Sequence, residues 1–590
     1  MQRLTINFIS GKKKFLIFCF SLLSVYSFAQ VLNDSQVFES GHWIYESLNE
    51  LEAEQENFGF FEVQPMSVGE IKFYFEKFDF DKLSPRGQTA YKKVSDFLYS
   101  SSNFLSDVLK NENFRFAFAP RLNPEFYYKT NSQVDWSFNY DYKDNFGTLP
   151  LIFGFGNNVA AEADVFYGMD YYSAKKSTNF TNIVFLQNFL SDYSVNQNEA
   201  WILFCNSGFS KNFNGWGLSS NLGRTGLNFL NTLGGSVFYS DTFETDFFWQ
   251  LNLFSDFARY SCDVVQIATN RYMYLHQIAL RPFKNLKLSI IEGGLLNAPF
   301  ELRFVNPIVL VHSYHARLNY NATFPYPDDA YASYFGWYIE YFPMKNLHAY
   351  ILLAQDELQL NSEKTKLGLL IPNGIGVQLG ADYKLPLNSQ DALKFQLEST
   401  YTTPFMYIKS KPGHSFYSHR QNAYYANYID SWTGTSYGPN TFATQVIITF
   451  DKYSKFSVSL DYSFIMHGDT DFSIFEQTDE NGYYTYFPWV RYQASDKSDE
   501  SYNECLDESR GHLLNGVIQY TNKFALRGEY KFSDRISLGG QILYSLIFNC
   551  NNLSGNTQHC VEFTLFSRLE LFDLNEFVKS EVNKILVKTI

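Results

Sequence analysis

Hydrophobic and polar positions alternate with a period of two over most of this chain, from about residue 113 onward. The stretch 134–142 shows the pattern clearly, and 456–464 and 563–571 repeat it. In a β-strand, such alternation places apolar side chains on one face and polar side chains on the other. Strands of this kind are typical of a transmembrane barrel, where apolar residues face lipid and polar residues face a wet lumen.

The connections between the predicted strands alternate in length. Short polar turns lie at 282–285, 343–346, 451–455 and 533–534, whereas long stretches lie at 319–333, 409–441 and 494–512. Barrels have short periplasmic turns and long extracellular loops. Because a spanning strand uses about 9 to 11 residues, the region 113–572 predicts an all-β fold, a large antiparallel transmembrane β-barrel of about 18 strands. An even count places both ends of the chain in the periplasm.

The segment 30–112 has helical periodicity instead. One helix is expected from about His42 to Leu51. A second begins at Ser67, which with Glu70 has the form of a capping box, and a third begins at Ser84, before a proline. We expect a periplasmic helical segment, and a plug inside the barrel is the alternative. The first helix also faintly resembles the opening of an S-layer homology domain, which would imply a contact with peptidoglycan.

The two ends of the chain differ from the rest. Residues 1–29 have the form of a signal peptide, with Lys12, Lys13 and Lys14 before the apolar run 15–28 and cleavage expected after Ala29. A membrane anchor helix is the alternative, but the run is shorter than the ~20 residues that a bilayer needs. The tail 573–590 is expected to remain in the periplasm, where it could form a short amphipathic helix.

The composition fits a barrel better than several soluble domains. Aromatic residues make up 19% of the 590 residues, with 60 Phe and 43 Tyr, yet mean hydropathy is only -0.24. Barrels use such rings as girdles at both membrane interfaces. Loss of 1–29, which holds Arg3 and three lysines and no acid, takes the net charge from -14 to -18. An acidic chain is a poor ligand for nucleic acid, so we expect no such partner.

Motifs of enzymes are missing from the sequence. It has no Gly-x-Ser-x-Gly elbow, no His-Glu-x-x-His and no phosphate-binding loop. His312 and His315 would point to opposite faces of an extended segment. The acidic loop 496–510 lacks the residue order of a tight calcium loop. We therefore expect no enzyme, no cofactor and no metal. Cys550 and Cys560 lie at the two ends of one loop, and export would permit a disulfide there, which the sequence leaves open.

Several stretches in the middle of the chain follow one another in an order that resembles a known family. They are 275–282, 286–292, 304–307 with His312, 338–350 leading to 355–357, 397–407 and 434–440, with Gly223-Arg224 ahead of them. This order, across roughly 200–470, resembles the Wzi family of capsule assembly proteins. The resemblance implies a non-enzymatic outer-membrane barrel that binds or anchors capsular or exopolysaccharide, with long loops at the cell surface.

The partners expected are surface polysaccharide and outer-membrane lipid, and the barrel is expected to be a monomer. Rings in the long loops are candidates for stacking on sugars, with a girdle at the lipid interface as the alternative that is favoured for any single ring: Tyr424, Tyr425, Trp432, Tyr483 and Trp489. Charges in or near the matched stretches are candidates for a lumen ion network: Arg224, Arg281, Glu292, Asp356 and Glu357. A porin-like uptake channel and a surface adhesin remain alternatives of the same architecture.

Overall fold

The computed structural model describes most of the chain. The described residues are 33–99, 106–110, 114–118, 120–134, 146–167, 183–185, 202–240, 246–306, 331–360, 362, 372–409, 412–422, 427–453, 455–472, 474, 509–511, 513–533 and 535–570. The expected signal peptide and C-terminal tail lie outside these residues, as do His312, His315 and nearly all of the loop 496–510.

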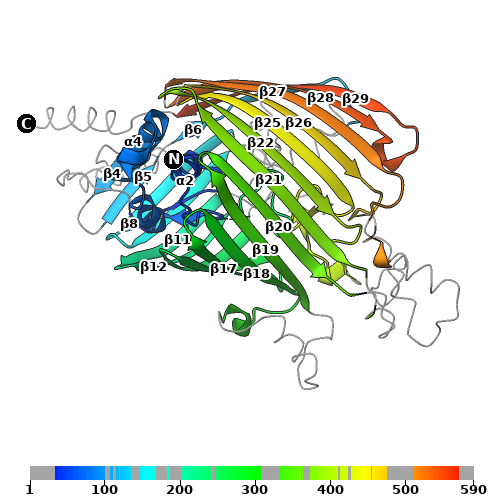
Figure 1. Cartoon of the computed structure of the whole chain (residues 1–590), viewed down its shortest axis with the longest axis horizontal. Coiled ribbons are helices and arrows are strands. Elements are labelled where there is room, and N and C mark those ends of the chain that lie inside the picture. Colours follow the sequence, from blue (N-terminus) through cyan, green and yellow to red (C-terminus); the bar gives the residue numbers. More distant parts are fainter. Residues whose placement is uncertain are drawn as a thin grey trace, which may run out of the picture.

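Antiparallel strands form one closed barrel of 18 strands, as the sequence predicts (Figure 1). Its sheet comprises 22 strand segments, which is more than the number of barrel strands, because strands near the closure are divided into short pieces such as β6 and β7. The ring closes where β29 pairs with β6 and β7, and where β9 pairs with β11. The segments are β4 (Ser106–Lys110), β5 (Phe114–Phe118), β6 (Arg121–Leu122), β7 (Glu125–Lys129), β8 (Gly147–Phe155), β9 (Val159–Tyr167), β10 (Ile183–Phe185), β11 (Ile202–Phe213), β12 (Trp216–Thr225), β15 (Asp246–Ser255), β16 (Ala258–Ala268), β17 (Arg271–Phe283), β18 (Leu286–Leu296), β19 (Tyr331–Met344), β20 (Leu347–Glu357), β21 (Gly374–Pro386), β22 (Asp391–Thr402), β25 (Thr441–Lys452), β26 (Phe456–His467), β27 (Gln519–Ser533), β28 (Ile536–Phe548) and β29 (Gln558–Glu570).

Hydrophobic side chains on alternate strand positions face outward. They remain exposed although they are large, which is how a lipid-facing wall differs from a soluble sheet. Members of this outer belt on successive strands are Phe247, Leu253, Ile278, Leu288, Ile290, Trp337, Leu353, Leu379, Phe395, Leu397, Leu460, Leu526, Leu538 and Ile542. The expected strands at 456–464 and 563–571 correspond to β26 and β29, whereas 135–142 lies outside the described residues.

The helices expected near the start of the chain are confirmed. They are α2 (Trp43–Gln55), α3 (Val68–Phe75) and α4 (Pro85–Tyr99), with the short η1 (Phe80–Lys82) between the last two. The Ser67 hydroxyl caps α3 by accepting a hydrogen bond from the Glu70 amide at 3.2 Å. The return bond of a capping box is not formed, because the Glu70 carboxylate binds a residue of the barrel wall instead. Within the described residues, no helix is long and apolar enough to cross a membrane.

The helices gather at one end of the barrel, beside the short turns (Figure 1). The backbone amide of Phe58 donates to the carbonyl of Lys284, in the turn between β17 and β18, at 3.0 Å. The amide of Asn346, in the turn between β19 and β20, donates to the carbonyl of Ala53 at 2.8 Å. The segment 33–99 therefore sits in the short-turn mouth of the barrel, which corresponds to the plug alternative.

Candidate functional site

Buried ion pairs join the segment in the mouth, called the plug below (residues 33–99), to the inner wall. On α3, a Glu70 oxygen lies 2.7 Å from Arg259 Nε of β16, and both side chains are fully buried. The hydroxyls of Ser67 and Ser210, the latter on β11, lie 3.0 Å apart beside them. A buried charge without a partner costs free energy, so Glu70 and Arg259 are stable in these positions only when both are present. The plug is thus held in one position against β11 and β16.

Two further clusters repeat this arrangement around the mouth. Lys287 of β18 lies 2.9 Å from Glu62 of the plug and 2.5 Å from Glu340 of β19. A second cluster centres on Glu50 of α2, which lies 2.9 Å from Arg86 of α4 and 2.7 Å from Lys384 of β21. Arg86 also bonds to Asp451, at the end of β25. The contacts span the wall from β16 to β25, so the plug is fixed on several sides.

A second layer lies deeper in the lumen, where the connection between β12 and β15 folds inward. It contains β13 (Asn228–Phe229), which pairs with β14 (Tyr239–Ser240) and with β2 (Val63–Gln64) of the plug. The buried carboxylate of Glu398 on β22 accepts hydrogen bonds from the amides of Leu233 at 2.7 Å and Gly234 at 2.8 Å. Gln378 of β21 accepts from the Val237 amide at 2.9 Å. We call residues 226–240 the inner loop.

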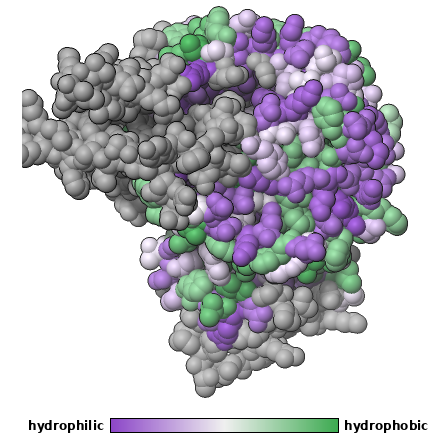
Figure 2. All heavy atoms as spheres, turned by 90° about the vertical axis from the view of Figure 1, so that its left-hand side faces the viewer, coloured by the Kyte–Doolittle hydropathy of each residue, from purple (hydrophilic) through white to green (hydrophobic). Residues whose placement is uncertain are grey.

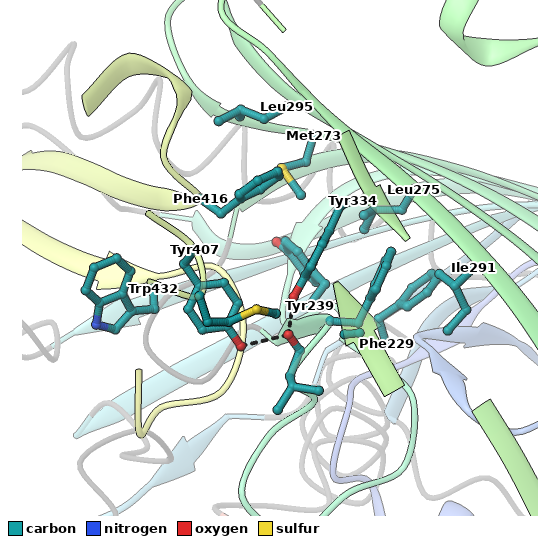
Figure 3. Packing of buried hydrophobic residues seen from close by; sticks show 14 of the residues in the cluster. Phe229, Tyr239, Met273, Leu275, Ile291, Leu295, Tyr334, Tyr407, Phe416 and Trp432 are labelled. Atoms are coloured by element: carbon teal, nitrogen blue, oxygen red, sulfur yellow. Dashed lines mark hydrogen bonds between the residues drawn. The ribbon is translucent and has the colours of Figure 1, made fainter. Parts of the chain in front are cut away.

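The connection between β22 and β25 adds a third layer against the inner loop. The Tyr407 hydroxyl donates to the carbonyl of Val237 at 2.7 Å, and the Tyr334 hydroxyl donates to the same oxygen (Figure 3). The Tyr407 amide donates to Asp356 at 2.6 Å. Buried hydrophobic residues of the wall and of both loops meet in one cluster, including Phe229, Val237, Phe238, Met273, Leu275, Tyr334, Tyr338, Tyr407, Phe416 and Trp432.

The inner wall on the other side of the barrel is polar. On β25 and β26, Gln445 donates to Asp461 at 2.8 Å. The next strand, β27, adds Lys523 and Arg527. The side chains of these two residues, of Gln445 and of Asp461 all keep some solvent-accessible surface. The hydrophobic filling therefore lies against β12 to β22, and the wall of β25 to β27 faces a more hydrated space.

Three of the predicted lumen charges do face inward or hold an inward loop. Arg281 donates to Asn57 of the plug at 3.1 Å and also to the carbonyl of Phe58. Lys409 lies 3.7 Å from Asp356 and 3.4 Å from Glu357, next to Tyr407. These residues thus position the plug and the third layer.

The prediction was wrong for Arg224 and Glu292, which belong to the outer face. Arg224 shares a strand face with Leu222, which is 59% exposed, and its guanidinium lies 5.6 Å from the ring centre of Phe247. Glu292 shares a strand face with the exposed Ile290 in the same way. The physical reason is alternation: residues two positions apart along a strand point to the same side, so both charges face outward with their apolar neighbours.

Trp432 does not present a free ring to a sugar. It is 7% exposed, and its ring stacks on Phe472 at 4.2 Å between ring centres, inside the third layer. The other candidate stacking rings, Tyr424, Tyr425, Tyr483 and Trp489, lie outside the described residues. Cys550 and Cys560 are both buried, and the disulfide that their spacing permits is not formed in the structure.

Sequence reasoning missed the residues that fill the lumen. Glu398 and Thr435 belong to the matched stretches, but nothing in the pattern marked them as contacts of the inner loop. Glu70 and Arg259 are 189 positions apart in the chain, and no local signal pairs them. The sequence offered one hint: Arg259 is a charged residue in a strand that also carries small polar residues, which indicates a position on the inner wall. Among the described residues, no group of three or more His, Cys, Asp or Glu is placed to hold a metal ion.

Comparison with known proteins finds relatives by structure alone. No family model matches the sequence, and no curated protein matches it. Among solved structures, the chain is similar to Wzi of Escherichia coli, an outer-membrane protein involved in group 1 capsule assembly and described as a carbohydrate-binding β-barrel. The TM-score is 0.53 at 10% identity, over 91% of this chain and 99% of that one. At this identity, the likeness shows the fold, that of an outer-membrane barrel.

Other outer-membrane barrels are more distant. OmpT of Vibrio cholerae gives a TM-score of 0.32 at 10% identity, and the channel DcaP of Acinetobacter baumannii gives 0.32 at 8%. Each comparison covers 78% of this chain and 99% of the other.

Proposed function

We propose that this protein is a Wzi-like, non-enzymatic barrel of the outer membrane that holds capsular or exopolysaccharide at the cell surface. The short-turn end with its plug faces the periplasm, and the long loops face outward. The barrel fold and the likeness to a carbohydrate-binding barrel over 91% of the chain support this proposal. The ordered stretches between about residues 200 and 470 point to the same family.

The observation that carries the proposal is the filled lumen. An uptake channel needs a continuous wet path, but here the plug, the inner loop and the third layer pack in the lumen against β12 to β22. Buried ion pairs hold the plug to the wall, β2 of the plug pairs with β13 of the inner loop, and the cluster around Val237 and Tyr407 joins the inner loop to the third layer. Opening such a path would expose buried apolar surface, at about 25 cal/mol per Å², and would separate buried charges. A barrel closed in this way is suited to anchoring a ligand at its outer end.

The sugar is expected to bind at the long loops. Tyr and Trp present an apolar ring face with a polar edge, which suits the alternation of C–H and hydroxyl groups on a neutral sugar. Tyr424, Tyr425, Tyr483 and Trp489 are the rings that we assign to this role. Trp432 supports the third layer from within instead.

Glycan binding by the purified barrel tests the proposal. A glycan array should show binding of wild-type protein to surface polysaccharide, and alanine at Tyr424, Tyr425, Tyr483 and Trp489 together should weaken it by about tenfold or more, as for truncated hot-spot rings. The matched control is Trp337→Phe, a change on the lipid-facing wall that should leave binding unchanged. Absence of glycan binding by wild-type protein, or equal binding by the loop variant, would overturn the proposal.

A further inference from the structure

Exposed lysines recur at the short-turn rim of the barrel, although the chain as a whole is acidic. Lys284 and Lys345 lie in the turns after β17 and β19, and Lys452 and Lys455 flank the turn after β25. Lys211 lies near the end of β11, and all five are exposed. We call them the rim lysines. The rim therefore differs in charge from the molecule as a whole.

Three of these positions, those of Lys284, Lys345 and Lys211, adjoin the hydrophobic belt at its short-turn edge. Phe283 and Met344, which directly precede Lys284 and Lys345, are 66% and 52% exposed. Lys211 alternates with the exposed Phe209 and Phe213, so it shares the outward face. Its ammonium lies 5.5 Å from the centre of the Phe213 ring. Long lysine stems can follow apolar surface and place the charge at the level of the lipid headgroups.

Three acids at the same end are paired with cations of the plug or of the wall. Asp256 bonds to Lys77, and Asp451 bonds to Arg86. Glu570 lies 3.7 Å from Arg121. In the part of the chain that the structure describes, the rim lysines take part in none of the ion pairs. Their charge is thus available to an anion outside the protein.

We propose that the rim lysines bind the phosphate groups of anionic phospholipids in the leaflet that surrounds the short-turn end. We favour lipid over a soluble anionic polymer as the ligand, because the rim lysines lie on the barrel wall near lipid-facing side chains. Figure 2 looks onto the end that holds the plug and shows hydrophilic residues over much of the described surface. A lysine near an anionic membrane surface attracts it appreciably, and the attraction falls off within a Debye length.

Lipid retention by the full-length barrel in detergent tests this proposal. The protein is mixed with equal amounts of phosphatidylglycerol and phosphatidylcholine, and bound lipids are counted by native mass spectrometry. We expect wild-type protein to prefer phosphatidylglycerol, and the preference to fall in about 1 M salt, where the Debye length is about 3 Å. Glutamine at all five rim lysines should reduce the preference about tenfold.

Two controls separate charge from folding and position. Arginine at the same five positions should keep the preference, because the charge remains. Lys82→Gln with Lys92→Gln, on the exposed side of the plug, should leave it unchanged. The proposal is wrong if wild-type protein shows no preference or if the glutamine variant keeps it. It is also wrong if a soluble anionic polysaccharide binds the rim lysines and phosphatidylglycerol does not compete. None of these results depends on glycan binding by the outer loops.

Discussion

At the scale of single residues, the account depends on charges that are buried in pairs. Arg259 and Glu70 are the deepest example, since both side chains are fully buried. Arginine is suited to such a position because its planar guanidinium stays charged and donates in fixed directions. A buried pair of this kind adds little net stability, but loss of one partner is costly. Its effect is to specify where the plug sits.

Arg259→Met should destabilise the folded barrel, because Glu70 would be left as a buried charge without a partner. We expect a loss of about 3–5 kcal/mol, measured as the unfolding midpoint in urea followed by gel mobility. The control is Arg259→Met combined with Glu70→Gln, which removes both charges and should recover much of the loss. Equal destabilisation of the single and the double variant would contradict a role for the pair.

The ionisation of Glu52 should make the stability of the plug depend on pH. Burial raises the pKa of its carboxyl to about 8, above the ordinary value of 4.5, and the carboxyl accepts a hydrogen bond from the Gly59 amide. The folded state therefore keeps a proton that the unfolded state releases above about pH 4.5. The contribution of Glu52 to stability should be highest below that pH and should fall as pH rises toward about 8, by at most about 1.4 kcal/mol per pH unit.

Glu52→Gln should remove this component, because glutamine keeps the acceptor for Gly59 and does not titrate. The unfolding midpoints of the two proteins should converge at low pH and diverge as pH approaches 8, with the variant more stable. If both proteins lose stability in parallel over this interval, Glu52 does not titrate as proposed.

At the scale of elements, the position of α3 against β11 can be trapped covalently. Ser67 and Ser210 face each other with their hydroxyls 3.0 Å apart. Cysteine at both positions should form a disulfide in the folded barrel, identified by mass spectrometry of the linked peptides. Cysteine at Ser67 and at Ser537, which lies on β28, should not form one. Failure of the first pair to cross-link, or equal cross-linking of both pairs, would contradict the docking of the plug.

The sequence allowed the elements to be predicted more reliably than their contacts. Alternation along a strand, the helical period of residues 42–51 and the caps at Ser67 and Ser84 are local, so they predicted β26, β29 and all three helices. Contacts across the lumen are not local. Glu398 binds amides 164 and 165 positions earlier in the chain, and only the closed sheet brings them together. The errors at Arg224 and Glu292 are of another kind, since local alternation with Leu222 and Ile290 places both charges on the outer face.

At the scale of the whole molecule, a closed barrel combines two opposite environments. The outer belt is exposed and apolar, while much of the inner wall is polar and meets the plug through ion pairs. Such a wall is stable only where lipid covers the belt. The plug, the inner loop and the third layer fill the lumen against β12 to β22, and on this filling rests our proposal of an anchor rather than a channel.

Conductance across a planar bilayer tests the closed lumen most directly. Purified wild-type protein, shown to be folded by a shift in gel mobility on boiling, is added beside an open porin as the positive control. We predict no stable conductance steps from the protein, because the plug occupies the short-turn mouth and the inner loop and third layer fill the lumen against β12 to β22. Steady steps that increase in number with the amount of inserted protein would show an open path and would contradict the anchor.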